Sequence, residues 1–146
     1  MKSPETEIPR SESGARESAE KPRKRVLIID DDHSYIDSMR GLMEAYYGDD
    51  DNIAVVECHS VDDARRAISS VSPNVIFLDH HFSRTEDDAG MVIAEEIRGH
   101  SPNVKIYSTT TDEYTAGKYA DMGIEHVGKS DIAGMRNIID SERRDA

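Results

Sequence analysis

The segment Asn74–Asp79, with the sequence NVIFLD, decides the fold of this chain. Four consecutive apolar residues, Val75–Leu78, follow Pro73 and lead directly into Asp79. A short apolar run bounded by a chain breaker is typical of a strand in a parallel sheet. Asp79 is therefore expected at the carboxyl end of a strand, which makes it the most informative residue of the sequence.

Three other apolar segments also end in polar residues. They are Val26–Ile29, which runs into Asp30 and Asp31, Val104–Tyr107, which ends in Ser108, and His126–Gly128, which ends in Lys129. In an open α/β sheet, functional groups lie outside the carboxyl ends of the strands, at the point where the strand order switches. The sequence thus predicts that an acid pair, a central aspartate, a hydroxyl group and an ammonium group share one crevice.

Helical periodicity separates these strands, a pattern that indicates a parallel sheet with helices on both faces. A further short strand is expected over Ile53–Cys58. Five helices are predicted, and the fourth of them lies near 112–122. In the other four, the predicted inward-facing positions recur at helical spacing: Ile36, Met39, Met43 and Tyr46 in the first helix, Val61, Ala64, Ile68 and Val71 in the second, Ile93 and Ile97 in the third, over 89–98, and Ile132, Met135, Ile138 and Ile139 in the fifth. Ser60, with Asp63 in a capping-box variant, is the predicted cap of the second helix, and Ser130 that of the fifth.

Composition divides the chain into a tail and one domain. Residues 1–24 are rich in Ser, Glu, Pro, Lys and Arg and have almost no apolar content. Such a segment cannot bury enough apolar surface to offset its ordering entropy, so it is predicted to be disordered. Residues 25–141 are predicted to form the folded domain, and residues 142–146 a charged C-terminal tail.

Charge and hydropathy exclude several classes of function. Residues 1–25 carry seven Lys or Arg and five Glu within a total net charge of −12, so the rest of the chain carries −14. An acidic domain is a poor match for a nucleic-acid backbone, so no direct nucleic-acid binding is expected. No apolar run approaches the roughly 20 residues of a membrane span, and the amino terminus has no secretory signal. With Cys58 as its single cysteine, the protein is expected in the cytoplasm, without membrane insertion.

The four strand ends together predict phosphoryl transfer to a carboxylate. This reaction needs positioning and charge stabilisation more than covalent help. Asp79 is the predicted nucleophile, which would form an acyl phosphate. Lys129 is expected to pair with one phosphoryl oxygen as a compact positive charge, and Ser108 to donate its hydroxyl to another.

The acidic residues also predict a magnesium site. Magnesium prefers oxygen ligands and keeps several waters, so one or two carboxylates and a phosphoryl oxygen suffice. Asp31 is the expected direct ligand beside Asp79, and Asp30 is expected to bind through water. The backbone carbonyl of His81 is a possible third contact from the protein.

From Arg25 to Asp140 the chain resembles a response-regulator receiver domain, the phosphoacceptor module of two-component signalling. The similarity lies in the acid-pair strand over 26–32, the acceptor strand over 74–79, the hydroxyl strand over 104–109 and the lysine strand over 126–129. The resemblance implies a flavodoxin-like, doubly wound five-stranded parallel sheet of order 2-1-3-4-5 with five helices. It also implies phosphorylation by a sensor histidine kinase or a histidine phosphotransfer protein. A downstream protein target would then bind the face of the fourth and fifth helices.

Several positions depart from the usual pattern of that family. The loop His80–Gly90 lacks the usual Met-Pro pair and is longer than usual, and the pair His80–His81 suggests a variant subgroup. His126 occupies the usual position of the aromatic switch residue. Thr109 follows Ser108 where a small residue is typical, so either hydroxyl is a candidate sensor of the phosphoryl group.

The sequence predicts a single-domain response regulator, because nothing after the fifth helix can encode an output domain. It would signal by phosphorylation-dependent binding of a partner or by passing the phosphoryl group through a relay. It would not be an enzyme beyond catalysing its own phosphorylation and dephosphorylation.

Two alternatives stay open at this stage. The first is a degenerate receiver, a phosphorylation-independent binding module, which the altered loop and His126 motivate. The second is a phosphatase of the haloacid-dehalogenase type, with Asp30 as nucleophile and Asp32 as general acid. In that case the pair 87–88 would be the distal acids, and Asp79 would have no role.

Overall fold

The computed structural model describes residues 23–83 and 87–144, in which strands and helices alternate. In chain order they are β1 Val26–Asp30, α1 His33–Tyr47, β2 Ile53–Glu57, α2 Val61–Val71, β3 Val75–Leu78, α3 Ala89–His100, β4 Lys105–Ser108, α4 Glu113–Asp121, β5 Glu125–His126 and α5 Ile132–Arg144. The segment 1–24 was predicted to be a disordered tail, and its residues 1–22 lie outside the described residues. None of the helices described is long and apolar enough to cross a membrane.

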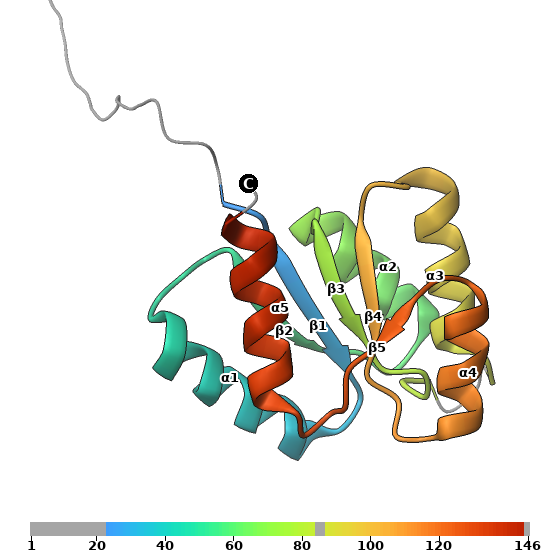
Figure 1. Ribbon diagram of the computed structural model, residues 1–146, viewed down its shortest axis with the longest axis horizontal. Coiled ribbons are helices and arrows are strands. Elements are labelled where there is room, and N and C mark those ends of the chain that lie inside the picture. The colour runs from blue at the N-terminus through green and yellow to red at the C-terminus, as the bar shows by residue number, and fades with distance from the viewer. Residues whose placement is uncertain (1–22, 84–86, 145–146) are drawn as a thin grey trace, which may run out of the picture.

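All the strands run parallel, in the order β2-β1-β3-β4-β5. The predicted flavodoxin-like, doubly wound sheet is therefore confirmed. Strand β1 lies between β2 and β3, so the switch of strand order falls between β1 and β3. Figure 1 shows the strand arrowheads converging at one end of the sheet, where the loops that follow β1, β3 and β4 gather.

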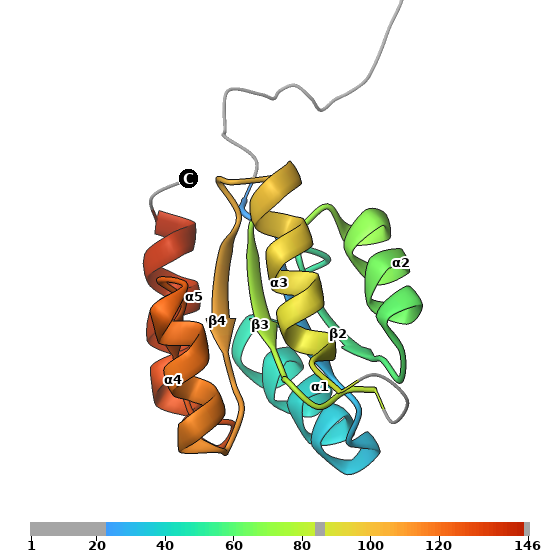
Figure 2. The same cartoon turned by 90° about the vertical axis from the view of Figure 1, so that its right-hand side faces the viewer.

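Helices cover both faces of the sheet, with α1 and α5 on one side and α2, α3 and α4 on the other (Figures 1 and 2). Side chains alternate between the two faces along each strand. In β1, Leu27 and Ile29 face α2 and α3, whereas Val26 and Ile28 face α1 and α5. Every residue of β1 and β3 is consequently buried, which explains their continuous apolar sequences.

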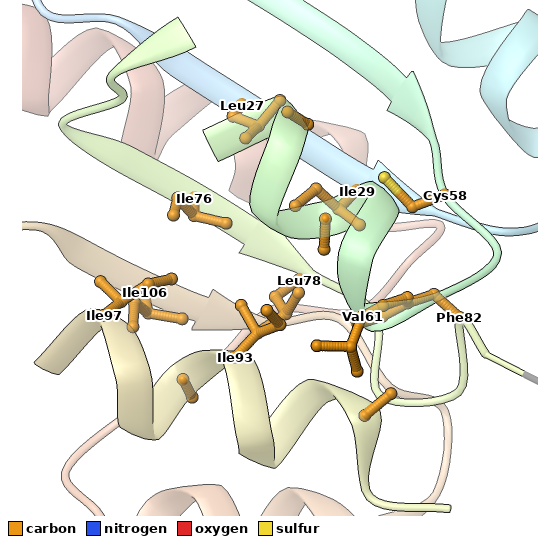
Figure 3. Close-up of a cluster of buried hydrophobic side chains, with 14 of the residues drawn as sticks. Leu27, Ile29, Cys58, Val61, Ile76, Leu78, Phe82, Ile93, Ile97 and Ile106 are labelled. Atoms are coloured by element: carbon orange, nitrogen blue, oxygen red, sulfur yellow. The ribbon is translucent and has the colours of Figure 1, made fainter. Parts of the chain in front are cut away.

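The loop that follows β3 is anchored in the core by Phe82. This side chain is fully buried and lies in the cluster with Val61 of α2 and Cys58, which follows β2 (Figure 3). Burying a Phe side chain contributes roughly 2 kcal/mol. The chain just beyond Asp79 is therefore held by core packing and not only by its backbone.

Side-chain caps begin the helices near the functional end of the sheet. The predicted cap of α2 is confirmed, because Ser60 Oγ accepts a hydrogen bond from the Asp63 amide at 3.0 Å. The Asp63 carboxylate in turn accepts from the His59 amide at 3.0 Å. The predicted Ser130 cap of α5 is wrong by one residue, because Asp131 Oδ1 accepts from the Gly134 amide at 2.9 Å.

Tyr46 was predicted to face the core, and this prediction is wrong. The side chain is 44% exposed, and its ring packs under the Arg136 guanidinium, 3.8 Å from the ring centroid. At roughly 100° per residue, Tyr46 is rotated by about 80° from the direction of Ile36. The buried face of α1 therefore ends with Met43.

The predicted charged tail over 142–146 is wrong for residues 142–144, because α5 continues through Arg144. Glu142 is buried, accepts a hydrogen bond from Tyr107 Oη at 3.3 Å, and pairs with Lys24 at 3.5 Å. Arg143 forms an ion pair with Asp50. These tertiary partners hold the last helical turn, and residues 145–146 lie outside the described residues.

Candidate functional site

Three carboxylates meet where β1 and β3 end. Asp30 is the last residue of β1, Asp31 follows it, and Asp79 follows β3. The Asp79 amide donates to the Ile29 carbonyl at 3.1 Å, so the backbone pairing of β1 and β3 continues to the acids. One oxygen from each of the three side chains lies within 4.8 Å of the other two. The side chains that the sequence assigned to one crevice do lie together, and we call them the acid cluster.

Two members of the acid cluster are withdrawn from water, and Asp31 is half-buried. Asp30 is 0% exposed and Asp79 is 6% exposed. Burial raises the pKa of Asp79 to about 6, and the charge of Asp30 adds to this effect while Lys129 opposes it. Burial also raises the pKa of Asp30, against its hydrogen bonds with the Asp32 amide and Lys129. Buried carboxylates this close repel one another, so a cation among them is favourable.

Lys129 supplies positive charge to the acid cluster. Its Nζ lies 2.9 Å from Asp30 Oδ2 and donates a hydrogen bond to Asp30 Oδ1 at 3.1 Å. Burial opposes the charged form of Lys129, but the hydrogen bond and charge of Asp30, together with the charge of Asp79, raise its pKa. The ammonium that was predicted to bind a phosphoryl oxygen therefore rests on Asp30 in this structure.

Tyr35, which the sequence reasoning missed, holds Lys129 from the first turn of α1. Its Oη donates to the Lys129 carbonyl at 2.9 Å, and the Lys129 Nζ lies 4.7 Å from the centroid of its ring. An ammonium over an aromatic face is attracted by the ring quadrupole. The signal in the sequence was an aromatic residue one turn after Asp31.

The two hydroxyl candidates both lie at the end of β4. Ser108 is fully buried and is paired with Leu78 of β3, the residue before Asp79. The amide of Thr109 donates to the Leu78 carbonyl at 3.1 Å, which extends this pairing. Both residues thus lie beside the strand that carries Asp79.

Other residues that the sequence singled out lie away from the acid cluster or have other partners. Asp32 is exposed and caps α1, since its Oδ1 accepts from the Tyr35 amide at 3.2 Å. Asp87 and Asp88 are exposed at the start of α3. His126 is exposed at the end of β5. This arrangement gives no support to a phosphatase in which Asp32 is the general acid.

Comparison with known families identifies the chain. The sequence profile described as response regulator receiver domain matches residues 26–129. The chain belongs to this family. The matched span contains all the strand ends that form the site. Receiver domains generally act in signalling and are not classical enzymes.

The receiver domain also resembles solved receiver domains in fold. The signal receiver domain of a DNA-binding response regulator from Colwellia psychrerythraea is 20% identical with a TM-score of 0.67, over 81% of this chain and 96% of that one. A CheY-like receiver domain from Methylobacillus flagellatus is 20% identical with a TM-score of 0.63, over 82% and 98%. TrrA from Thermotoga maritima, in complex with Mg²⁺-BeF, is 18% identical with a TM-score of 0.64, over 81% and 97%. No curated protein sequence matches the chain.

Receiver domains generally bind Mg²⁺ at their acidic pocket, and the acid cluster of this receiver domain fits that ion. Its donor set consists of carboxylate oxygens, which Mg²⁺ prefers. In addition, Asp30 Oδ2 is buried and, among the described residues, accepts no hydrogen bond, although Lys129 Nζ lies 2.9 Å away. Burying a carboxylate oxygen without a hydrogen bond costs free energy, and a bound cation or one of its water ligands would remove that cost.

The two histidines after the acceptor of this receiver domain differ in their surroundings. The His80 side chain is only 3% exposed, whereas His81 is exposed to solvent. His80 Nδ1 lies 2.8 Å from Tyr119 Oη of α4, and its Nε2 lies 3.4 Å from Asp88 Oδ1. The His80–His81 pair, which departs from the usual pattern of the family, is thus divided between the core and the surface.

Gly90 in α3 is expected to tolerate no side chain. A Cβ at this position would lie 2.8 Å from His80 Cα and 3.1 Å from the Asp79 carbonyl, and would also meet the Tyr119 hydroxyl. Two of these three contacts are backbone, so the loop itself would have to shift. We expect Gly90→Ala to lower the free energy of unfolding by about 2 kcal/mol, in the range of overpacked cores.

Urea denaturation followed by circular dichroism measures this loss. Gly99→Ala in the same helix is the matched control, because a Cβ there would meet nothing within 4 Å. If the two variants were equally stable, the close packing of Gly90 against the acceptor loop, as we call the segment 79–81, would be disproved.

Proposed function

We propose that this receiver domain accepts a phosphoryl group on Asp79 with the help of Mg²⁺. The observation that carries the proposal is the acid cluster of Asp30, Asp31 and Asp79 at the switch point, with Lys129 bound to it. Two buried carboxylates beside a half-buried third destabilise a fold unless positive charge offsets their repulsion, so this cluster is best explained by what it binds.

In the proposed reaction an oxygen of Asp79 attacks the phosphorus of the donor. A bond forms between this oxygen and phosphorus, while the bond from phosphorus to the leaving atom breaks and the leaving atom keeps the electron pair. Bound Mg²⁺, held by the acid cluster and the His81 carbonyl, would neutralise charge on the phosphoryl oxygens. Lys129 would move from Asp30 to one phosphoryl oxygen, and Ser108 or Thr109 would donate its hydroxyl to another.

The proposed phosphoryl donors are a sensor histidine kinase or a histidine phosphotransfer protein. The phosphorylated form would signal by binding a downstream protein, or would pass the phosphoryl group along a relay. Phosphorylation adds charge and acceptor oxygens at one end of the sheet, which is a means of shifting a two-state equilibrium. The acidic charge of the domain argues against direct binding to nucleic acid.

The test is the intact-protein mass after incubation with acetyl phosphate and magnesium. We expect one phosphoryl adduct in the native protein and background levels in Asp79→Asn or when EDTA replaces magnesium. Asp49→Asn, which removes an exposed carboxylate after α1, is the matched control and should form the adduct normally. An adduct that survives Asp79→Asn would disprove the assignment of Asp79.

A phosphorylation-independent binding module is the second candidate, because the loop after Asp79 lacks the usual Met-Pro pair. The same experiment separates the two candidates. If the native protein forms no adduct and also binds no beryllofluoride with magnesium, the binding module is the better description.

A further inference from the structure

His80 and Tyr119 connect the acceptor loop to α4 through the core. His80 follows Asp79 directly, and Tyr119 lies near the end of α4. Both side chains are buried, at 3% and 0% exposure, and their rings meet edge to face with centroids 5.5 Å apart. The 2.8 Å hydrogen bond between Nδ1 and Oη is thus shielded from water.

The backbone around His80 and the Tyr119 hydroxyl both pack against Gly90 of α3. The Gly90 amide donates to the His80 carbonyl at 3.1 Å, which fixes the loop on the first turn of α3. A Cβ on Gly90 would touch Tyr119 Oη, His80 Cα and the Asp79 carbonyl together. The Tyr119 hydroxyl and the peptide that joins Asp79 to His80 therefore both lie against Gly90.

Either tautomer of neutral His80 can form the hydrogen bond with Tyr119. Neutral His80 with its proton on Nε2, toward Asp88, leaves Nδ1 to accept the tyrosine O–H, and the opposite tautomer can donate to the tyrosine oxygen. Either form gives a hydrogen bond with one defined geometry. A buried bond of this kind selects one conformation of the loop more than it adds stability.

We propose that Tyr119 is a positioning residue for the phosphoryl site. Through His80 it holds the Asp79–His81 backbone in the conformation that binds magnesium and the phosphoryl group, and this links the site to the position of α4. The inference rests on the proposed function and assigns to it a residue that touches neither the metal nor the phosphoryl group.

Titration calorimetry of Mg²⁺, and of beryllofluoride in saturating Mg²⁺, tests the proposal on the full chain. We expect Tyr119→Phe to weaken beryllofluoride binding about fivefold to tenfold, the size of one hydrogen bond. Tyr47→Phe is the matched control, since Tyr47 Oη donates to Asp140 at 2.8 Å between α1 and α5. The Tyr47→Phe variant loses a side-chain hydrogen bond far from the acceptor loop, so its affinity for beryllofluoride should stay at the native value.

Rescue at His80 separates positioning from general stability. His80→Asn keeps a polar atom near the place of Nδ1 and should retain most of the affinity. His80→Leu should lose as much affinity as Tyr119→Phe, and combining the two should add no further loss. Hydrogen exchange gives a second readout: beryllofluoride should slow exchange of α4 amides in the native protein but not in Tyr119→Phe.

The outcomes distinguish this inference from the function on which it rests. If native protein binds beryllofluoride and Tyr119→Phe binds it equally well, the positioning role is overturned and the proposed function stands. If Tyr47→Phe weakens binding as much as Tyr119→Phe, the effect is one of stability and the inference is again overturned. If the native protein binds neither ligand, both proposals are wrong.

Discussion

Lys129→Met is expected to lower the free energy of unfolding by about 3 kcal/mol at pH 7.5 without divalent cations, as for other broken buried pairs. Lys129 is the ion-pair partner of Asp30, whose side chain is fully buried. Methionine keeps much of the aliphatic volume of lysine but removes its charge and donors. Asp30 would then stay buried beside Asp31 and Asp79 without the ammonium that now offsets their repulsion.

Urea denaturation in EDTA measures this loss, and Lys118→Met is the control. Lys118 lies on α4 with its Nζ 5.0 Å from the centroid of the Tyr114 ring, so its removal should change stability by less than about 0.5 kcal/mol. Adding millimolar magnesium should recover most of the loss in Lys129→Met, because the ion takes over the charge of the ammonium. Equal stability of the two variants in EDTA would contradict a stabilising role for the Lys129–Asp30 pair.

The acid cluster was predictable because its members end apolar strands. A run such as Val75–Leu78 can be recognised locally, and parallel topology then brings strand ends to one edge of the sheet. The inward positions of α2 and the cap at Ser60 followed from helical spacing in the same way. Strand ends and helix faces, which follow from the periodicity of strands and helices, could therefore be predicted from the sequence.

Partners from distant elements could not be predicted in this way. His80 and Tyr119 are separated by 39 positions, and Arg143 and Asp50 by 93. Each pair depends on the rotation and length of two elements that pack only in the folded protein. The predicted C-terminal tail was wrong at residues 142–144 for this reason, since a charged sequence becomes helix where tertiary partners hold its side chains.

The choice between Ser130 and Asp131 as the cap of α5 shows a subtler limit. Both residue types are good N-caps, and they stand next to each other in the sequence. The cap lies in the turn around Lys129, where the Asp131 amide donates to the Gly128 carbonyl at 3.0 Å and Tyr35 of α1 donates to the Lys129 carbonyl. The residues around the cap therefore have a tertiary contact that the local sequence does not reveal.

Asp79→Asn is expected to raise the free energy of unfolding by up to about 3 kcal/mol at neutral pH in EDTA. The carboxyl of Asp79 has its pKa raised from 3.8 to about 6, first by burial and then by the charge of Asp30. Between these two values the folded state binds more protons than the unfolded state, so stability falls as the pH rises from about 4 to about 6. Above that range the folded protein carries the whole penalty of the ionised carboxylate, which the amide avoids.

The decisive measurement is the difference in free energy of unfolding between Asp79→Asn and the native protein as a function of pH. Native protein and Asp79→Asn should be nearly equal in stability at pH 4, should diverge up to about pH 6, and should then keep a constant difference. Asp49→Asn, which replaces an exposed carboxylate, should show no such divergence. Saturating magnesium should reduce or reverse the gain, because the native acid cluster binds the ion more tightly than the variant does. A difference that does not change with pH would mean that packing of the amide, and not the charge of Asp79, sets the stability of this site.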